Sequence, residues 1–280
     1  MEQKQIKNLP RVERWDSQKQ VFERSESLLA ALGFADWKTL PRVVSLVGAG
    51  GKTSTMYDLA RELTDAGASV LVTTSTHIMK PEHENCVVTD RLEHLKLSEF
   101  DAQRQHGGWM LVAGKQAAGK GAEQKLTMPE DLGDEKVMKQ LLSWFDVVLI
   151  EADGSKRLPL KVPSETEPVL ISQTGLVIAC AGLSAGTKTF EEACFRFASQ
   201  GSWLKRSDKD KIQPEDMALI LMDERGSHKG VAGCCYRIVL NQADSIVEQK
   251  QAEEIARLLP LTMQDGCVRT SRRVSCEKAK

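Results

Sequence analysis

The chain has 280 residues, of which 41% are hydrophobic and 28% charged, and its formal net charge is −1. This composition predicts a soluble globular protein and, with only 5% aromatic residues, argues against a nucleic-acid-binding module. No apolar run reaches the roughly 20 residues that span a bilayer, so we expect no membrane partner. The seven cysteines form no C-x-x-C pair and the first forty residues lack a secretion signal, so we expect a cytoplasmic protein without disulfides or a zinc ribbon.

The beginning of the chain is polar, and we expect residues 1–20 to be frayed. Leu28, Leu29 and Leu32 then recur at helical spacing within residues 21–34. The sequence therefore predicts an N-terminal extension with a leading helix over residues 1–40, followed by one folded domain over residues 41–280.

A glycine-rich run follows the apolar segment 42–47 and precedes a segment with apolar residues at helical spacing. Glycines let consecutive backbone N–H groups turn toward one anion, and the following helix presents the positive end of its dipole. Lys52 is suited to neutralise phosphates, and the Thr53 hydroxyl is suited to ligate Mg²⁺. The predicted nucleotide-binding residues are Gly48, Ala49, Gly50, Gly51, Lys52, Thr53 and Ser54.

This run departs from the pattern G-x-x-x-x-G-K-[ST], because Leu46 stands where the first glycine belongs. The shorter form G-x-x-G-K-T fits, and it resembles the loop of the ATP-dependent peptide-adding ligases of cell-wall synthesis. The alternative is a glycine turn between a strand and a helix that carries Lys-Thr by chance.

Further apolar runs are short, rich in β-branched residues and bounded by turn formers, and they alternate with helical stretches. These predicted strands span residues 69–73, 86–88, 110–113, 147–150, 176–181 and 238–240. Together with the glycine-rich loop they predict an α/β fold similar to P-loop NTPases, with a mostly parallel, doubly wound sheet flanked by helices. We expect an exposed loop at 114–127 and a solvated turn at 206–211.

Two carboxylates, Glu151 and Asp153, end the apolar strand 147–150, and Gly154 follows them. A carboxylate beside a phosphate loop holds Mg²⁺ or its water in phosphoryl-transfer sites. Both side chains point the same way if the strand continues, so we expect Glu151 and Asp153 to join Thr53 at the metal or to activate water. The alternative is two solvated acids at a turn.

A hydroxyl cluster ends the second predicted strand, at the ligand-binding edge of an open parallel sheet. We expect Thr74 and Thr76 to contact substrate and His77 to transfer a proton. Structural roles are the alternative, since threonine is common in strands. His77, His83 and Cys86 form a second alternative, a soft-metal site.

A basic, proline-stiffened loop follows the two carboxylates. Lys156, Arg157 and Lys161 predict the binding of an anionic second substrate or of charge that develops in the transition state. A solvated loop is the alternative.

The apolar run 238–240 leads into Asn241, Gln242 and Asp244, followed by a predicted helix over 245–259. This order resembles the N-K-x-D guanine-recognition element of GTPases, with Gln242 in place of the lysine whose stem packs over the base. Asp244 would accept hydrogen bonds from the guanine ring and Asn241 would brace the loop. The alternative is an Asn turn and a helix cap.

Taken together, these segments resemble the YqeC family over roughly residues 25–275. The matching motifs are VSLVGAGGKT at 44–53, VTTSTHI at 72–78, IEADGS at 150–155 with LKVP at 160–163, and LNQAD at 240–244. The family is described as accessory proteins for selenium-dependent molybdenum hydroxylases, so the resemblance implies such a hydroxylase or its cofactor as a partner.

We therefore expect a Mg²⁺-dependent protein that binds a nucleoside triphosphate, GTP rather than ATP, and hydrolyses it or transfers a group from it. Lys52, Glu151, Asp153 and His77 are the predicted catalytic residues. The resemblance makes the predicted role the maturation of a molybdenum hydroxylase. Two alternatives stay open: an ATP-dependent ligase- or kinase-like enzyme acting on an anionic small molecule, and a chaperone that nucleotide binding switches without turnover.

Overall fold

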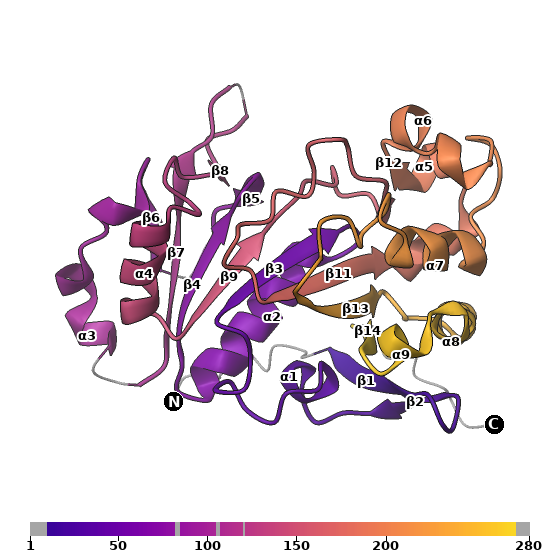
Figure 1. Cartoon of the computed structure of the whole chain (residues 1–280), viewed down its shortest axis with the longest axis horizontal. Helices are drawn as coiled ribbons and strands as arrows, with labels where there is room; N and C mark the ends of the chain where they lie inside the picture. The colour runs from indigo at the N-terminus through magenta and orange to yellow at the C-terminus, as the bar shows by residue number, and fades with distance from the viewer. Residues whose placement is uncertain (1–9, 82–84, 105–106, 120, 273–280) are drawn as a thin grey trace, which may run out of the picture.

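A twelve-stranded sheet organises the computed structural model, which describes residues 10–81, 85–104, 107–119 and 121–272 (Figure 1). Its strands are β1 (Arg11–Asp16), β2 (Val21–Arg24), β3 (Val43–Gly48), β4 (Ser69–Thr74), β5 (His77–Met79), β6 (Asn85–Val88), β7 (Trp109–Gln116), β8 (Lys125–Thr127), β9 (Val147–Glu151), β11 (Leu176–Gly182), β13 (Cys235–Asn241) and β14 (Cys267–Ser271). A separate parallel pair is formed by β10 (Leu160–Lys161) and β12 (Cys194–Phe195).

The centre of the sheet is parallel, in the order β14-β13-β11-β3-β9-β4-β7, and β6 also runs parallel to β7. Antiparallel strands complete both ends, with β1 and β2 beside β14 and with β8 and β5 beside β7. The prediction of a mostly parallel α/β sheet is confirmed, and the loop after β3 lies near its middle.

Helices cover both faces of the sheet. One face packs against α1 and α2, where Val44 and Leu46 meet Met56 and Leu59. The other face packs against α4 at one end and against α7 and α8 at the other (Figure 1). The helices are α1 (Leu28–Ala31), α2 (Lys52–Asp65), α3 (Asp101–Arg104), α4 (Glu135–Trp144), α5 (Phe190–Ala193), α6 (Phe197–Gln200), α7 (Pro214–Met222), α8 (Ile246–Leu258) and α9 (Leu261–Gln264).

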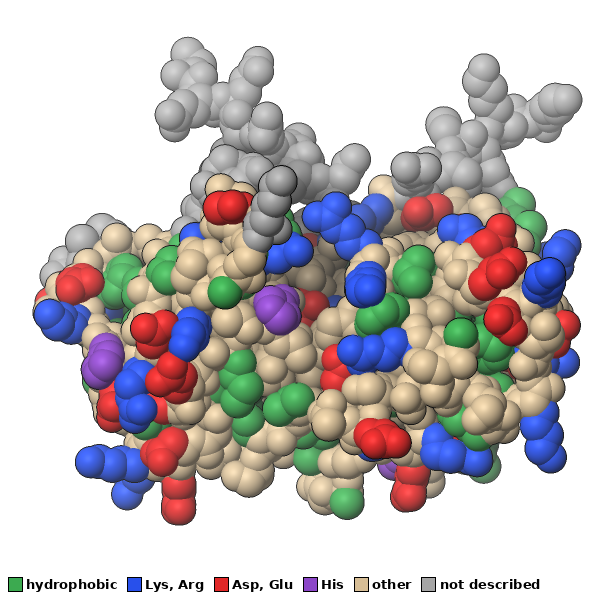
Figure 2. Space-filling model, turned by 90° about the horizontal axis from the view of Figure 1, so that it is seen from above, with side chains coloured by type: hydrophobic (Ala, Val, Ile, Leu, Met, Phe, Trp, Pro, Cys, Tyr) green, Lys and Arg blue, Asp and Glu red, His purple; other side chains and the backbone are tan. Residues whose placement is uncertain are grey.

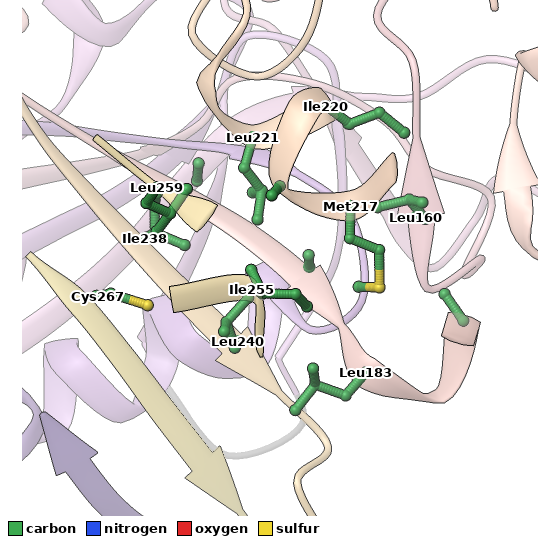
Figure 3. Packing of buried hydrophobic residues seen from close by; sticks show 14 of the residues in the cluster. Leu160, Leu183, Met217, Ile220, Leu221, Ile238, Leu240, Ile255, Leu259 and Cys267 are labelled. Carbon is green, nitrogen blue, oxygen red and sulfur yellow. The ribbon is translucent and has the colours of Figure 1, made fainter. Parts of the chain in front are cut away.

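Strand alternation explains this two-sided burial. Ile238 and Leu240 point from β13 toward Met217, Leu221 and Ile255 on the side of α7 and α8, while Val239 belongs to the cluster around α2 (Figure 3). Most of the buried parallel strands therefore read as continuous apolar runs, which is why the sequence located them. Strand β14 was not predicted, because Arg269, Thr270 and Ser271 interrupt its apolar pattern although they are buried. In the part of the chain that the structure describes, no helix is long and apolar enough to cross a membrane.

The N-terminal prediction differs from the structure. Residues 11–24 form a hairpin, β1 and β2, and β1 pairs with β14, while α1 covers only Leu28–Ala31 rather than 21–34. The burial of Trp15 against Phe22 explains the difference, because these aromatic side chains join the core beside α8. Part of the predicted extension thus belongs to the sheet, and residues 1–9 lie outside the described residues.

The loop predicted at 114–127 is also partly wrong. Strand β7 continues to Gln116, and β8 pairs with it and with β5, so much of the segment is sheet. Leu126 is fully buried and Ala117 and Ala122 are nearly so, and the wide spacing of these apolar side chains within a polar segment explains why composition was misleading. Residues 206–211 are exposed, as predicted.

Candidate functional site

The glycine-rich loop connects the carboxyl end of β3 to the first residue of α2, Lys52. Gly48 and Gly50 have positive φ angles of 87° and 66°. A Cβ atom on Gly48 would lie 2.3 Å from the carbonyl oxygen of Cys180, and one on Gly50 would lie 2.2 Å from the amide nitrogen of Gly182. The tight fit against β11 therefore requires glycine at both positions.

The backbone amides of this loop divide into two groups. The Ala49 amide donates to the Cys180 carbonyl oxygen at 2.9 Å, and the Gly50 amide donates to that of Leu158 at 3.1 Å. These two bonds fix the loop against its neighbours. The first-turn amides of α2 have no partner within their helix by its geometry, so an anion would meet the amides from Gly51 onward rather than the whole glycine run.

Lys52 is 3% exposed and lies among oxygen atoms. Its Nζ donates to the Gly48 carbonyl oxygen at 2.6 Å and lies 3.0 Å from Asp153 Oδ1 and 3.9 Å from Glu151 Oε1. Burial lowers the pKa of Lys52, but the charges of Asp153 and Glu151 outweigh burial, so the pKa lies above its ordinary value. Lys52 is therefore a buried ammonium group at the start of α2.

The two carboxylates occupy different surroundings. Glu151 Oε2 accepts a hydrogen bond from the Thr53 hydroxyl at 2.6 Å, and burial raises the pKa of Glu151 despite the nearby Lys52. Asp153 Oδ2 accepts from the Gly48 amide at 2.9 Å and lies 3.2 Å from Lys161 Nζ. Both carboxylates thus meet Lys52, as expected for one side of an extended chain, but only Glu151 bonds the hydroxyl of Thr53.

A cleft of about 1040 Å³ opens beside this group. Seen from above, Lys and Arg side chains gather around a hollow near the middle of the molecule (Figure 2). The cleft contacts the loop and start of α2, the antiparallel pair formed by β5 and β8, and the segments 154–158 and 195–196. Its ionisable lining residues are Lys52, His77, Lys125, Glu151, Lys156, Arg157, Glu167 and Arg196.

The basic loop contributes two of its three predicted residues to the cleft. Lys156 and Arg157 line it with left-handed φ angles of 47° and 64°, and Arg196 does so with a φ of 64°. Such backbone is unfavourable for non-glycine residues and is concentrated at functional sites. Lys156 Nζ lies 5.2 Å from the centre of the Phe195 ring, and Arg196 also packs against this ring.

The structure places Lys161 beneath the cleft rather than in its wall. This residue is 1% exposed, and its Nζ donates to Glu167 Oε2 and to the Gly154 carbonyl oxygen, both at 2.7 Å. Because Lys161 also pairs with Asp153, it links the carboxylate beside the glycine loop to Glu167 and, through Glu167, to Arg196.

The predicted hydroxyl cluster also divides into residues in the wall of the cleft and a buried residue behind the wall. Thr74 is buried and donates to the Glu151 carbonyl oxygen at 2.9 Å, which fixes the end of β9. Thr76 and exposed His77 line the cleft. His83, from the soft-metal alternative, lies outside the described residues, and the described residues contain no cluster of three or more His, Cys, Asp or Glu side chains that could hold a metal.

A smaller hollow of about 140 Å³ lies on the other side of the glycine loop and shares Gly50, Gly51, Ser54 and Gln242 with the cleft. Asn241 and Asp244 line it. Asn241 donates to the Thr55 hydroxyl oxygen at 3.2 Å and accepts from the Thr270 hydroxyl at 2.6 Å, so it braces α2 against β14. The structure therefore brings the predicted base-recognition loop next to the predicted phosphate loop.

Sequence reasoning missed several charged residues of these two cavities. Arg196 and Glu167 form an ion pair in the wall of the cleft, and Arg272 and Asp58 form another in the wall of the hollow. Asp58 and Arg272 are separated by 214 positions along the chain, so no local pattern signals their pairing. The two consecutive arginines at 272–273 are visible in the sequence, but nothing near them in the sequence indicates an ion pair with Asp58.

The fold and the site define an α/β protein with a glycine-rich loop and a buried lysine beside two carboxylates. The chain belongs to the YqeC family: the family model described as "YqeC protein" matches residues 44–198. It is also 34% identical over 203 residues to the "Uncharacterized protein YqeC" of Escherichia coli (strain K12). The aligned region covers 71% of this chain and 74% of that relative. No solved structure matches the chain significantly.

Proposed function

We propose that this protein binds a Mg²⁺-nucleoside triphosphate over the loop that begins α2 and hydrolyses it or transfers its terminal phosphoryl group. The observation that carries the proposal is the 2.6 Å hydrogen bond between Thr53 and Glu151, formed beside the buried Lys52. A hydroxyl, a carboxylate and an ammonium group at a helix start are the parts that phosphate and Mg²⁺ require.

The donor set fits Mg²⁺, which protein sites usually hold through one or two carboxylates together with substrate phosphates and water. Thr53 and Glu151 would hold the ion, which would neutralise charge on the phosphates. Asp153, placed between Lys52 and Lys161, would keep Lys52 charged and oriented. Its contact with the Gly48 amide favours this supporting role over direct metal binding.

GTP is the nucleotide that the surroundings of Asp244 support best. The hollow that Asp244 and Asn241 line adjoins Gly51 and Ser54, so a base there lies within reach of phosphates on the helix start. A carboxylate accepts hydrogen bonds from the ring N–H and the amino group of guanine, and adenine does not present this pair of donors.

The rest of the large cleft supports a second, anionic substrate. Thr76, His77, Lys156 and Arg157 face this space opposite the glycine loop, and Thr74 supports the strand end behind them. His77 is the proposed proton-transfer residue of this substrate. The proposal also includes a substrate or partner connected with a selenium-dependent molybdenum hydroxylase, as the resemblance implies, and this reaction would assist the maturation of that hydroxylase.

An ATP-dependent kinase- or ligase-like reaction is the second candidate. It is favoured by the size of the cleft and by its basic wall, which leave room for an acceptor molecule beside the nucleotide phosphates. This reaction would show nucleotide turnover only when the acceptor is present, whereas a GTPase would show turnover alone.

Isothermal titration of the purified protein with Mg-GTP, Mg-ATP and Mg-CTP, each repeated with EDTA in place of Mg²⁺, tests both candidates. Selective Mg-GTP binding supports the first candidate, and a preference for Mg-ATP supports the second. Absence of binding to all three nucleotides refutes nucleotide binding, and equal affinity with and without Mg²⁺ refutes the metal site.

A further inference from the structure

Arg272 spans one side of the small hollow. Its backbone amide donates to Asp244 Oδ1 at 2.9 Å, and its guanidinium group pairs with Asp58 on α2. All three residues line the hollow. The side chain of Arg272 is 49% exposed, so it separates the hollow from solvent, whereas that of Asp58 is only 10% exposed.

In the N-K-x-D element, the residue after the asparagine is the lysine whose stem packs over the base, and Gln242 occupies this position. Gln242 has a left-handed φ of 67°, and its Oε1 accepts a hydrogen bond from the Ser184 hydroxyl at 2.6 Å. Its side-chain amide also approaches Gly182, toward β11. The Gln242 side chain is therefore held by the β11 side of the loop, and the face of a bound base needs cover from another residue.

The hollow has a volume of about 140 Å³, which is small for a purine base. A cavity of about 150 Å³ holds one benzene ring, so a two-ring purine requires one wall to move outward. Two residues around the hollow are exposed, Arg272 and Ser54, and Ser54 is a short side chain at the start of α2, so the wall that can move outward is the one formed by Arg272. Thr55, Asn241 and Thr270 are buried and joined by hydrogen bonds.

We propose that Arg272 is a specificity-determining residue of the nucleotide site: its planar guanidinium packs over the face of the purine, and its backbone amide orients Asp244 toward the base edge. Asp58 holds the guanidinium over the hollow. Arginine is suited to this role because its flat, delocalised cation stacks on aromatic rings. The inference rests on the proposed function, since it assigns a further residue to the proposed nucleotide site.

The test compares two probes, Mg-GTP and Mg-tripolyphosphate, which carries three phosphates but no base. Isothermal titration of both is carried out on the unaltered protein and on Arg272→Ala, Arg272→Lys and Arg104→Ala. Arg104 is a matched control, because it is also an ion-paired, partly exposed arginine but belongs to α3, outside both cavities. Circular dichroism melting identifies any variant that fails to fold.

We expect Arg272→Ala to weaken Mg-GTP binding roughly tenfold, the scale of a desolvated cation–π contact, and to leave tripolyphosphate binding within about twofold. Arg272→Lys should retain part of the GTP affinity, and Arg104→Ala should match the unaltered protein for both probes.

Equal losses for GTP and tripolyphosphate in Arg272→Ala would overturn the inference, because they would indicate a general charge effect. Unchanged GTP affinity in Arg272→Ala, with tight binding by the unaltered protein, would overturn the inference and leave the proposed function intact. If Arg272→Ala does not fold, Arg272→Lys decides by the same comparison. Binding of neither probe to the unaltered protein would refute the inference and the proposed function together.

Discussion

The hydroxyl of Thr53 donates to Glu151 Oε2 at 2.6 Å and so joins two positions that are 98 residues apart in the chain. One belongs to the first turn of α2, and the other ends β9, the strand beside β3. The contact closes the glycine loop against the sheet and places a hydroxyl, a carboxylate and the Lys52 ammonium within one small volume.

Replacing Lys52 by alanine should weaken Mg-triphosphate binding by about 1.5–3 kcal/mol, the scale of a hydrogen bond to a charged group. The physical reason is the loss of the cation that neutralises the phosphates. Isothermal titration measures the change, and Lys209→Ala, which removes an exposed lysine, is the control. Undiminished affinity in Lys52→Ala would refute the phosphate-loop assignment.

Replacing Lys161 by methionine should destabilise the protein by about 1.5–3 kcal/mol, the scale of a hydrogen bond to a charged group, because Asp153 and Glu167 lose the buried cation that they share. Asp153 keeps its contact with Lys52, and Glu167 keeps its ion pair with Arg196. Lys156→Met, five positions earlier and exposed, should change the free energy of unfolding by no more than about 0.5 kcal/mol. Urea unfolding compares the two variants. Similar free energies of unfolding for the two variants would show that the ion pairs of Lys161 with Asp153 and Glu167 do not stabilise the fold.

The ion pairs of Glu167 predict part of the acid sensitivity of the fold. Burial opposes its ionisation, but the hydrogen bond from Lys161 and the charges of Lys161 and Arg196 outweigh burial and lower the pKa of Glu167 below its usual 4.5. The resulting stabilisation is fully present above pH 4.5 and is lost as the pH falls through the lower, folded-state pKa.

Glu167→Gln should therefore lose less unfolding free energy than the unaltered protein when the pH falls below 4.5. Urea unfolding over a pH series measures this difference. Glu191→Gln, which removes an exposed carboxylate, is the control. Parallel pH curves for Glu167→Gln and the unaltered protein would contradict the assigned pKa direction.

Gly51→Ala should disturb the base-recognition loop. A Cβ at this position would lie 2.7 Å from Asn241 Nδ2, and the φ of Gly51 is 122°. Gly67→Ala is the matched control, because Gly67 also has a positive φ, 93°, but has open space around it. We expect Gly67→Ala to cost about 1–2 kcal/mol through its backbone alone.

Gly51→Ala should cost more than Gly67→Ala, because Asn241 must also give up hydrogen bonds to Thr55 and Thr270. It should weaken Mg-GTP binding, which Gly67→Ala should leave unchanged. Thermal unfolding and titration measure the two effects, and equal behaviour of the two variants would exclude a role for Asn241 as a brace.

Asp244→Asn should exchange the preferred base. An amide side chain offers a donor and an acceptor, which match the ring N–H and carbonyl of xanthine rather than the two donors of guanine. We expect GTP affinity to fall roughly tenfold or more and XTP affinity to rise. Competition titration measures both, and retained GTP selectivity in Asp244→Asn would remove the base-recognition assignment.

The sheet was predictable because parallel strands buried on both faces leave continuous apolar runs in the sequence, as in β9 and β11. The β1–β2 hairpin was not, since polar residues separate its few buried apolar side chains, which are Val12, Trp15 and Phe22. Its position depends on pairing with β14, at the other end of the chain.

The candidate site was predictable where chemistry is local in sequence, as in the glycine run and the carboxylates after β9. Burial was not predictable for Lys161, whose neighbours Lys156 and Arg157 are exposed. Its parallel pairing opposite Phe195 in the β10–β12 pair brings it beneath the cleft beside Glu167 and Arg196, and that pairing is a property of the tertiary fold.

The β1–β2 hairpin also determines which fragments of this protein are suitable for experiments. A fragment that begins at residue 41 would leave β14 as an exposed edge strand, open to pairing with other chains. It would also lose Glu13, the ion-pair partner of Arg269 on the strand that carries Thr270 and leads to Arg272. Strand β1 therefore supports the strand that leads to the proposed base site, and a fragment used for binding studies must include it.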